Sequence, residues 1–372
     1  MITAVSLFSV SLCAEERSAP LIVDHTGTAL SDISAEWIDT VREEMKLHYA
    51  HTSHGGQVTE GLSIIERNDS SYKVAINDRY LPGEEDALCI LYGQEIDSYI
   101  TPDEYWETRD GIEITHSVLK NNPTINVSMW SWCCQLDYYS EARVQSYLDT
   151  MTELENAHPE VTFIYMTGNA QKTGFEGFVR YVRNEQVRQY CIRNNKVLFD
   201  FADMDSWWFN TQTNEWEHAT YYYDGKDIPT EHPQFHGSDA GHTTFGSCEQ
   251  KGRALWWMMA KLAGWQDFPA GIEDDQKEPN PIYLGQNHPN PFNASTSIGY
   301  TVDIPGTVEL IIYNLSGQRV RTLFRGERER GFYSMVWDGT DDTGTSAPSG
   351  LYLYQINSPN GLRVTRKMMY LK

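Results

Sequence analysis

Residues 308–323 read V-E-L-I-I-Y-N-L-S-G-Q-R-V-R-T-L, and this stretch decides the fold of the last part of the chain. Residues 308–313 alternate and are rich in β-branched and aromatic side chains, which suits a half-buried strand. The polar break at 314–318 contains Gly317, and the alternation resumes at Arg319. We therefore predict a β-hairpin here.

The pattern continues toward the C-terminus. V-W-D-G-T-D-D-T-G (336–344) is a cluster of turn residues, and S-G-L-Y-L-Y (349–354) opens another strand. Short strands at this spacing, without helical periodicity, predict a small all-β Ig-like sandwich of antiparallel strands. The turn has two interpretations, a calcium site or a solvated acidic turn, and both concern Asp338, Asp341 and Asp342.

Two further motifs flank these strands. N-H-P-N-P-F-N-A-S-T-S-I-G-Y (287–300) precedes them, and T-R-K-M-M-Y-L-K (365–372) ends the chain. Together the motifs resemble the C-terminal sorting module of the type IX secretion system, a sandwich related to one in flagellar hook-capping proteins. The resemblance covers 282–372. It implies the type IX machinery as a partner and a secreted or cell-surface protein that passes through the periplasm.

Length and charge bound the rest. A chain of 372 residues predicts two domains, and an acidic stretch with three prolines predicts a linker at 267–281. The formal net charge of −23 argues against nucleic acid or an anionic membrane as a partner. With 40% hydrophobic residues the chain can build a normal core. We expect the first domain to span residues 30–266.

The N-terminus favours export. Residues 2–14 are apolar or small and are followed by charged residues at 15–17, so we predict a signal peptide and spacer over 1–20. No other long apolar run predicts a membrane span. Beyond the leader the sequence has an odd number of cysteines and no C-x-x-C motif. This pattern predicts neither a dense disulfide scaffold nor a metal site, and we expect no cofactor.

The first domain alternates strand and helix patterns. Strands are predicted at 46–50, 87–92, 124–132, 161–166 and 196–201, and helices at 57–65, 141–157, 176–194 and 248–265. This alternation favours an α/β fold with a mostly parallel, doubly wound sheet. In such sheets ligands bind beyond the carboxyl ends of the strands, where several polar motifs of this chain fall.

Two of these motifs suit nucleophilic catalysis. Ser53 follows the first strand within H-T-S-H-G-G (51–56), directly before a predicted helix whose N-terminus would stabilise developing negative charge. S-D-A-G-H (238–242) precedes the last helix, and its Asp-x-x-His spacing lets a carboxylate orient an imidazole base. The alternative role for Ser53 is to cap the helix that follows it.

In order and spacing, residues 45–265 resemble the SGNH (GDSL-like) hydrolases, which are flavodoxin-like α/β proteins. The resemblance implies Ser53 as nucleophile, His242 as base and Asp239 as the carboxylate that orients it. The sequence departs from the family in its motifs: H-T-S-H-G stands in place of G-D-S, and glycine-x-asparagine-aspartate is absent.

The same resemblance implies oxyanion donors after the second and third strands. Gly93 fits the first position. Strand order gives Gln135 for the second, whereas T-G-N at 167–169 looks more like the family motif and offers Asn169. The expected activity is that of a serine esterase acting on an ester-linked acyl group, with deacetylation of an acylated carbohydrate as one example.

Three alternatives stay open. The protein is a carbohydrate-binding surface protein that uses its tryptophans, or a glycoside hydrolase with an acid and base among Asp200, Asp203 and Asp205. Alternatively, five histidines form a metal site with Asp239. The tryptophans are Trp130, Trp132, Trp207, Trp208, Trp256 and Trp257, and the histidines are His51, His54, His232, His236 and His242.

Overall fold

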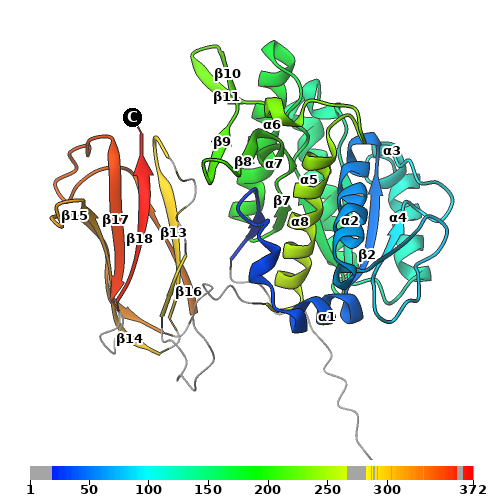
Figure 1. Cartoon of the computed structure of the whole chain (residues 1–372), viewed down its shortest axis with the longest axis horizontal. Coiled ribbons are helices and arrows are strands. Elements are labelled where there is room, and N and C mark those ends of the chain that lie inside the picture. The colour runs from blue at the N-terminus through cyan, green and yellow to red at the C-terminus, as the bar shows by residue number, and fades with distance from the viewer. Residues whose placement is uncertain are drawn as a thin grey trace, which may run out of the picture. The chain divides into compact units, whose positions relative to one another are not determined.

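The computed structural model describes residues 19–265, 282–285, 287, 290, 292–302, 304–329, 331–357 and 363–371. These residues belong to two compact units, one within 1–270 and the other within 271–372 (Figure 1). The predicted linker at 267–281 lies outside the described residues, as does the predicted leader at 1–20 apart from residues 19 and 20.

The first unit is built on a parallel sheet of seven strands in the order β1-β7-β6-β5-β2-β4-β3. This confirms the predicted parallel α/β sheet. Its central strands are buried apolar runs, as is typical when helices cover both faces. The strands are β1 (Leu21–Val23), β2 (Lys46–His51), β3 (Val74–Asn77), β4 (Leu88–Tyr92), β5 (Val127–Ser131), β6 (Thr162–Met166) and β7 (Val197–Phe199).

The helices form two packed groups. α2 packs on α8 together with α1, and α5 packs on α6. No helix within the described ranges has both the length and the apolar character needed to cross a membrane. The helices are α1 (Ala35–Glu44), α2 (Gly56–Asn68), α3 (Pro102–Tyr105), α4 (Arg109–Asn121), α5 (Glu141–Ala157), α6 (Gly174–Arg193), α7 (Phe201–Ser206) and α8 (Phe245–Leu262).

Two glycines allow α2 and α8 to approach closely. A Cβ added at Gly61 would lie 1.9 Å from the carbonyl oxygen of Cys248, and one added at Gly252 would lie 2.5 Å from the carbonyl carbon of Gly61. Only glycine fits at this crossing, and Figure 1 shows the two helices side by side. The contact fixes α2 relative to α8, and therefore also fixes the residues at the beginning of α2.

The direction of the chain through the sheet reverses at β2. From β2 the chain goes to the edge strand β3 and then to β4 on one side, and it returns to β5 on the other side of β2. Right-handed crossovers in opposite directions place their helices on opposite faces. The loops that leave β2 and β5 therefore diverge, and this is the position where ligands bind in doubly wound sheets.

Two short hairpins lie between α7 and α8 in the sequence. β8 (Trp207–Asn210) pairs with β9 (Glu215–His218), and β10 (Thr220–Tyr223) pairs with β11 (Lys226–Pro229). The sequence pattern did not predict them. Their strands have only four residues each, and a run that short carries little periodicity.

The second unit is all-β, as predicted, with antiparallel pairing throughout its described strands. The predicted hairpin is β14–β15, with Gly317 at φ 74° in its turn. One sheet contains β12 (Ile282–Leu284), β13 (Thr296–Val302) and β16 (Gly331–Trp337). The other contains β15 (Arg319–Arg328), β14 (Gly306–Asn314), β17 (Gly350–Asn357) and β18 (Arg363–Tyr370).

Candidate functional site

A thiol, an imidazole and a hydroxyl meet at the carboxyl ends of β2 and β5. Ser53 and His54 begin the short turn of helix that leads into α2, and Cys133 follows β5. His54 Nδ1 lies 3.0 Å from Cys133 Sγ, and Ser53 Oγ lies 3.2 Å from the same sulfur. Sequence reasoning gave Cys133 no role, although a cysteine and a histidine at two strand ends were visible in the sequence.

Gln171 fixes the tautomer of His54. Its amide nitrogen Nε2 lies 2.7 Å from the main-chain oxygen of His242 and 3.2 Å from Glu231 Oε1. Both oxygens can only accept when Glu231 is ionised, so the Gln171 carbonyl oxygen must face His54 Nε2, which is 2.8 Å away. His54 Nε2 therefore carries a proton, and Nδ1 is left to exchange one with the thiol of Cys133.

The electrostatics favour an ion pair between the two groups. Burial would raise the pKa of Cys133, but the hydrogen bond and charge of His54, with hydrogen bonds from Ser53 and Cys134, lower it to about 6. Burial likewise opposes the charged form of His54, yet contacts with Cys133 and Gln171 and the charge of Asp205 raise its pKa. Ser53 and His54, which contact the sulfur, lie just before the N-terminus of α2, whose positive dipole end favours a thiolate.

Both predicted amide donors contact Cys133, through its backbone. Gln135 Oε1 accepts from the Cys133 N–H at 2.6 Å, and Asn169 Nδ2 donates to the Cys133 carbonyl at 2.7 Å. Asn169 Oδ1 also accepts from the Gln171 N–H at 3.0 Å, which ties the β5 and β6 loops together. The amide nitrogen of Gln135 makes no hydrogen bond to any residue that the structure describes, so it can donate to a ligand.

The predicted triad comes together only in part. The exposed ring of His242 lies 5.0 Å from that of His54, centroid to centroid, so His242 belongs to the same site as Ser53. The Asp239 carboxylate accepts from the Phe245 N–H, 3.1 Å away at the start of α8. Within residues 19–265, no hydrogen bond joins the side chains of Ser53, His242 and Asp239.

Gly93, the remaining predicted donor, ends β4 with φ 98°. Its N–H donates to the Tyr49 carbonyl at 2.9 Å, and its own carbonyl lies 3.0 Å from His48 Nε2. An added Cβ would lie 2.2 Å from the Asp97 carbonyl oxygen. The position therefore requires glycine for the turn, and its N–H is already used within the sheet.

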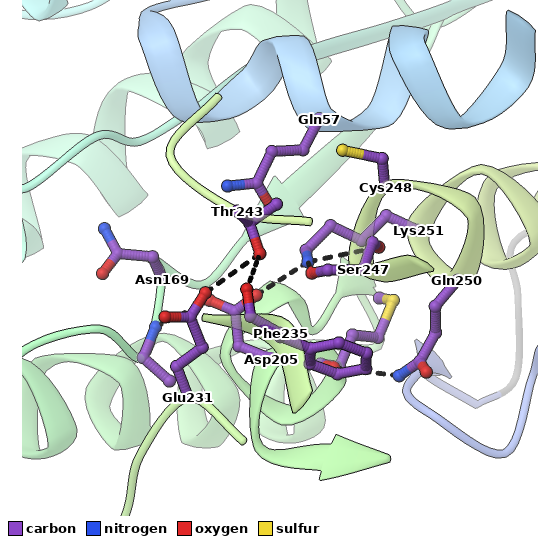
Figure 2. A network of polar contacts seen from close by, with 12 residues as sticks. Gln57, Asn169, Asp205, Glu231, Phe235, Thr243, Ser247, Cys248, Gln250 and Lys251 are labelled. Carbon is purple, nitrogen blue, oxygen red and sulfur yellow. Dashed lines mark hydrogen bonds and ion pairs between the residues drawn. The ribbon is translucent and has the colours of Figure 1, made fainter. Parts of the chain in front are cut away.

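A buried polar network lies behind the site (Figure 2). Lys251 of α8 pairs with Asp205 of α7 at 2.7 Å, and both side chains are fully buried. Lys251 also lies 2.6 Å from Ser247 Oγ, and the second carboxylate oxygen of Asp205 accepts from the Ala170 N–H at 2.8 Å. Ala170, which directly precedes Gln171, is thus hydrogen-bonded to the buried Lys251–Asp205 pair.

The three aspartates considered for glycoside cleavage each have a basic partner of their own. Asp200 receives two hydrogen bonds from Arg188, at 2.6 and 2.7 Å. Asp203 lies 2.6 Å from His25 Nδ1, and Asp205 pairs with Lys251. The structure therefore gives each of the three carboxylates a different basic partner.

Four of the six tryptophans considered for carbohydrate binding offer little open ring surface. Trp207 is stacked between His25 at 4.5 Å and His218 at 4.2 Å, so both of its faces are covered. Trp130, Trp132 and Trp256 lie in the core. Among the described residues, one group of three can supply metal ligands, namely Asp24, His25 and Asp203, and it contains none of the five histidines proposed from the sequence.

Comparisons with known proteins concern mainly the second unit. The sequence model of the FlgD Ig-like domain matches residues 292–361, and no curated protein matches the chain. Dimeric latent PorU of Porphyromonas gingivalis is 25% identical over 24% of this chain and 9% of its own, with a TM-score of 0.22. FlgD of P. aeruginosa is 19% identical over 21% of this chain and 64% of its own, with a TM-score of 0.18.

A β-glucosidase of Listeria innocua is 9% identical over 90% of this chain and 47% of its own, with a TM-score of 0.23. The chain thus spans less than two thirds of each of these three proteins.

Proposed function

We propose that the first unit is an acyl hydrolase that cleaves an ester-linked acyl group with Cys133 as its nucleophile. The observation that carries the proposal is the line of contacts from Cys133 Sγ to His54 Nδ1 and from His54 Nε2 to Gln171. A thiolate paired with an oriented imidazolium is the activated state that cysteine nucleophiles need. The proposed substrate class is that expected from the sequence, an acylated carbohydrate or other ester.

The reaction divides into two halves. In the first, the Cys133 thiolate bonds to the carbonyl carbon, and the leaving alcohol takes the Nδ1 proton of His54 as the ester bond breaks. In the second, His54 takes a proton from water, whose oxygen attacks the thioester and releases the acid and the thiolate. We assign the Gln135 amide nitrogen and the Ser53 hydroxyl as donors to the negative oxygen that forms in each half.

The second candidate keeps Ser53 as the nucleophile. Its hydroxyl lies within the same cluster, 3.2 Å from the thiol. The five central strands run β4-β2-β5-β6-β7, and this order supports the flavodoxin-like arrangement that the resemblance to SGNH hydrolases implies. In this version His54 or His242 serves as the base.

The two candidates differ in which side chain forms the covalent intermediate. We expect Cys133→Ala to abolish hydrolysis of p-nitrophenyl acetate, and iodoacetamide to inactivate the protein by alkylating Cys133. Ser53→Ala should retain measurable activity, reduced roughly 10²- to 10³-fold by loss of one donor to the negative oxygen of the transition state. Cys134→Ser, which keeps a hydrogen-bond donor beside Cys133, is the matched control and should be close to the wild type. Activity in Cys133→Ala, together with labelling of Ser53 by a fluorophosphonate, would establish the serine candidate instead.

We also propose that the second unit directs export to the cell surface, as the type IX resemblance implies. Its Ig-like match supports the fold on which that role depends. Deletion of residues 282–372 should leave the first unit folded and retained in the periplasm of a host with the type IX machinery. Export of the truncated protein at the wild-type level would refute the sorting role.

A further inference from the structure

We propose that Glu231 is a positioning residue that acts on His54 through Gln171, so that Cys133, His54, Gln171 and Glu231 work as one line. This inference rests on the proposed function, because it assigns a task within the same site. Sequence reasoning gave Glu231 no role. It follows β11, nearly 180 residues from His54 in the sequence (by their numbers, 231 and 54), and only the fold brings it near.

Hydrogen bonds hold both the backbone and the side chain of Glu231 in place, at the end of this line of contacts. Its main-chain N–H donates to the Ala170 carbonyl at 2.7 Å, which holds it beside the loop that carries Gln171. Its Oε1 atom accepts from Gln171 Nε2 at 3.2 Å and lies 3.0 Å from the Thr243 hydroxyl, whose single proton it shares with the Phe235 carbonyl. Figure 2 shows Thr243 between Glu231 and the carbonyl of Phe235. The carboxylate is therefore held in place from two sides.

The carboxylate has a reason to be buried at this point. Glu231 is only 6% exposed, and an isolated charge at that depth would be costly. As an ionised group it can only accept hydrogen bonds, and this fixes the orientation of the Gln171 amide. It also adds negative charge on the far side of the imidazole from the thiolate. Both effects favour a protonated, correctly oriented His54.

Several charges face this line from the neighbouring elements. Burial, followed by the charge of Asp205, raises the pKa of Glu231, while hydrogen bonds from Gln171 and Thr243 and the charge of Lys251 oppose the increase. His236 Nε2 lies 3.9 Å from Glu231 Oε2, and buried Arg180 of α6 also interacts with this carboxylate. On the other side, Asp205 and Asp137 interact with His54.

The sign of the effect on activity follows from the two titrations. The active ion pair exists above the pKa of Cys133, about 6, and below the pKa of His54, which is raised. Removing the Glu231 charge destabilises the imidazolium, so His54 should lose its proton at lower pH. Thiolate formation, in contrast, should still occur near pH 6. The pH range over which kcat/KM is high should therefore become narrower, because its upper limit moves to lower pH.

The test uses the full chain and the isosteric variant Glu231→Gln with p-nitrophenyl acetate as substrate. We expect kcat to fall roughly tenfold with KM nearly unchanged, and the alkaline limb to move to lower pH. The rate of iodoacetamide alkylation, measured in a Cys134→Ser background, should keep its midpoint near pH 6. Glu249→Gln is the matched control, because it removes a carboxylate that pairs with Arg253 on α8, and it should show the wild-type profile.

Two further variants keep the inference testable if Glu231→Gln does not fold. Glu231→Asp retains the charge and should retain the alkaline limb while lowering kcat through poorer alignment. Gln171→Ala should narrow the profile as Glu231→Gln does, and the double variant should be no worse than either single variant. If the losses in kcat from the two single variants added up in the double variant, or if the alkaline limb did not move, Glu231 would not act on His54 through Gln171. An active Cys133→Ala would instead refute the proposed function, so the two failures are distinguishable.

Discussion

The two units differ in whether they bury charged side chains. The first unit buries the Lys251–Asp205 pair completely, and the Arg188–Asp200 pair almost completely. In the described part of the second unit, the buried polar residues are Asn287 and Thr296, both neutral, and they bond to each other at 2.9 Å. The ion pairs of the second unit lie at its surface, as between Arg321 and Asp338.

The proposed function gives one reason for this difference, because it requires titratable groups in the first unit and none in the second. Buried ions cost solvation free energy that their mutual attraction does not fully recover, so stability alone gives no reason to keep them. In the first unit the charge of Asp205 helps to raise the pKa of both His54 and Glu231, which belong to the proposed site. The second unit, with an apolar core around Trp337, needs no such charges.

The largest effect should come from breaking the buried pair. Lys251→Met leaves the Asp205 carboxylate buried without its partner, which should destabilise the first unit by about 3–5 kcal/mol. The second unit should unfold as before. Thermal denaturation followed by calorimetry checks this as a shift of one transition, and equal shifts of both transitions would contradict two separate cores.

The reciprocal prediction targets the apolar core. Trp337 is fully buried, and its Nε1–H donates to the Thr340 carbonyl at 2.8 Å. Trp337→Ala should cost the second unit about 3–4 kcal/mol through the cavity that it leaves. Hydrolysis of p-nitrophenyl acetate should stay at the wild-type rate. A variant that loses activity in proportion to its stability would show that the units depend on each other.

A smaller effect should follow from removing the imidazole. In His54→Ala, burial of Cys133 is no longer opposed by the imidazolium, so the thiol pKa should rise from about 6 to the ordinary value of about 8.5 or higher. A change of two to three units corresponds to about 3 kcal/mol. The pH dependence of iodoacetamide alkylation, in a Cys134→Ser background, measures the change. A midpoint still near pH 6 would mean that His54 does not pair with the thiolate.

The smallest effect should come from a surface pair. Arg321 Nη1 lies 3.3 Å from Asp338 Oδ1 in the second unit, where both side chains are partly exposed. Asp338→Asn should change the free energy of unfolding by less than about 1 kcal/mol, because solvent already screens this pair. Urea denaturation of the second unit measures it. A loss of unfolding free energy as large as that expected for Lys251→Met would mean that charge pairs contribute equally to the stability of the two units.

Much of the fold could be predicted from the sequence because periodicity is local. The apolar run of β4 and the alternation of β14 identify a buried and a half-buried strand directly. α4 was not predicted, although its signal is local: its buried residues recur at helical spacing, as at Thr115, Val118 and Leu119, and Thr108 caps its N-terminus. The two hairpins before α8 were missed for lack of length.

The candidate site was only partly predictable because its partners are distant in sequence. His54 and Cys133 lie 79 positions apart and meet only because β2 and β5 are neighbours in the sheet, and the strand order cannot be read from local patterns. The rim containing Ser53 was predicted from its strand end. The role of Gln171 depends on which acceptors surround its amide, and only the three-dimensional structure shows them.

The glycine crossing of α2 and α8 sets the geometric tolerance of the site. Gly61 lies seven residues along the chain from His54, roughly 10 Å at the rise of a helix. A methyl group added at Gly61 or Gly252 would push α2 away from α8. This displacement would also move His54, which directly precedes α2. The chain can therefore lose its chemistry through a substitution that touches no polar atom. In evolution, we therefore expect substitutions to be accepted least often at these two glycines, which have no side chain at all.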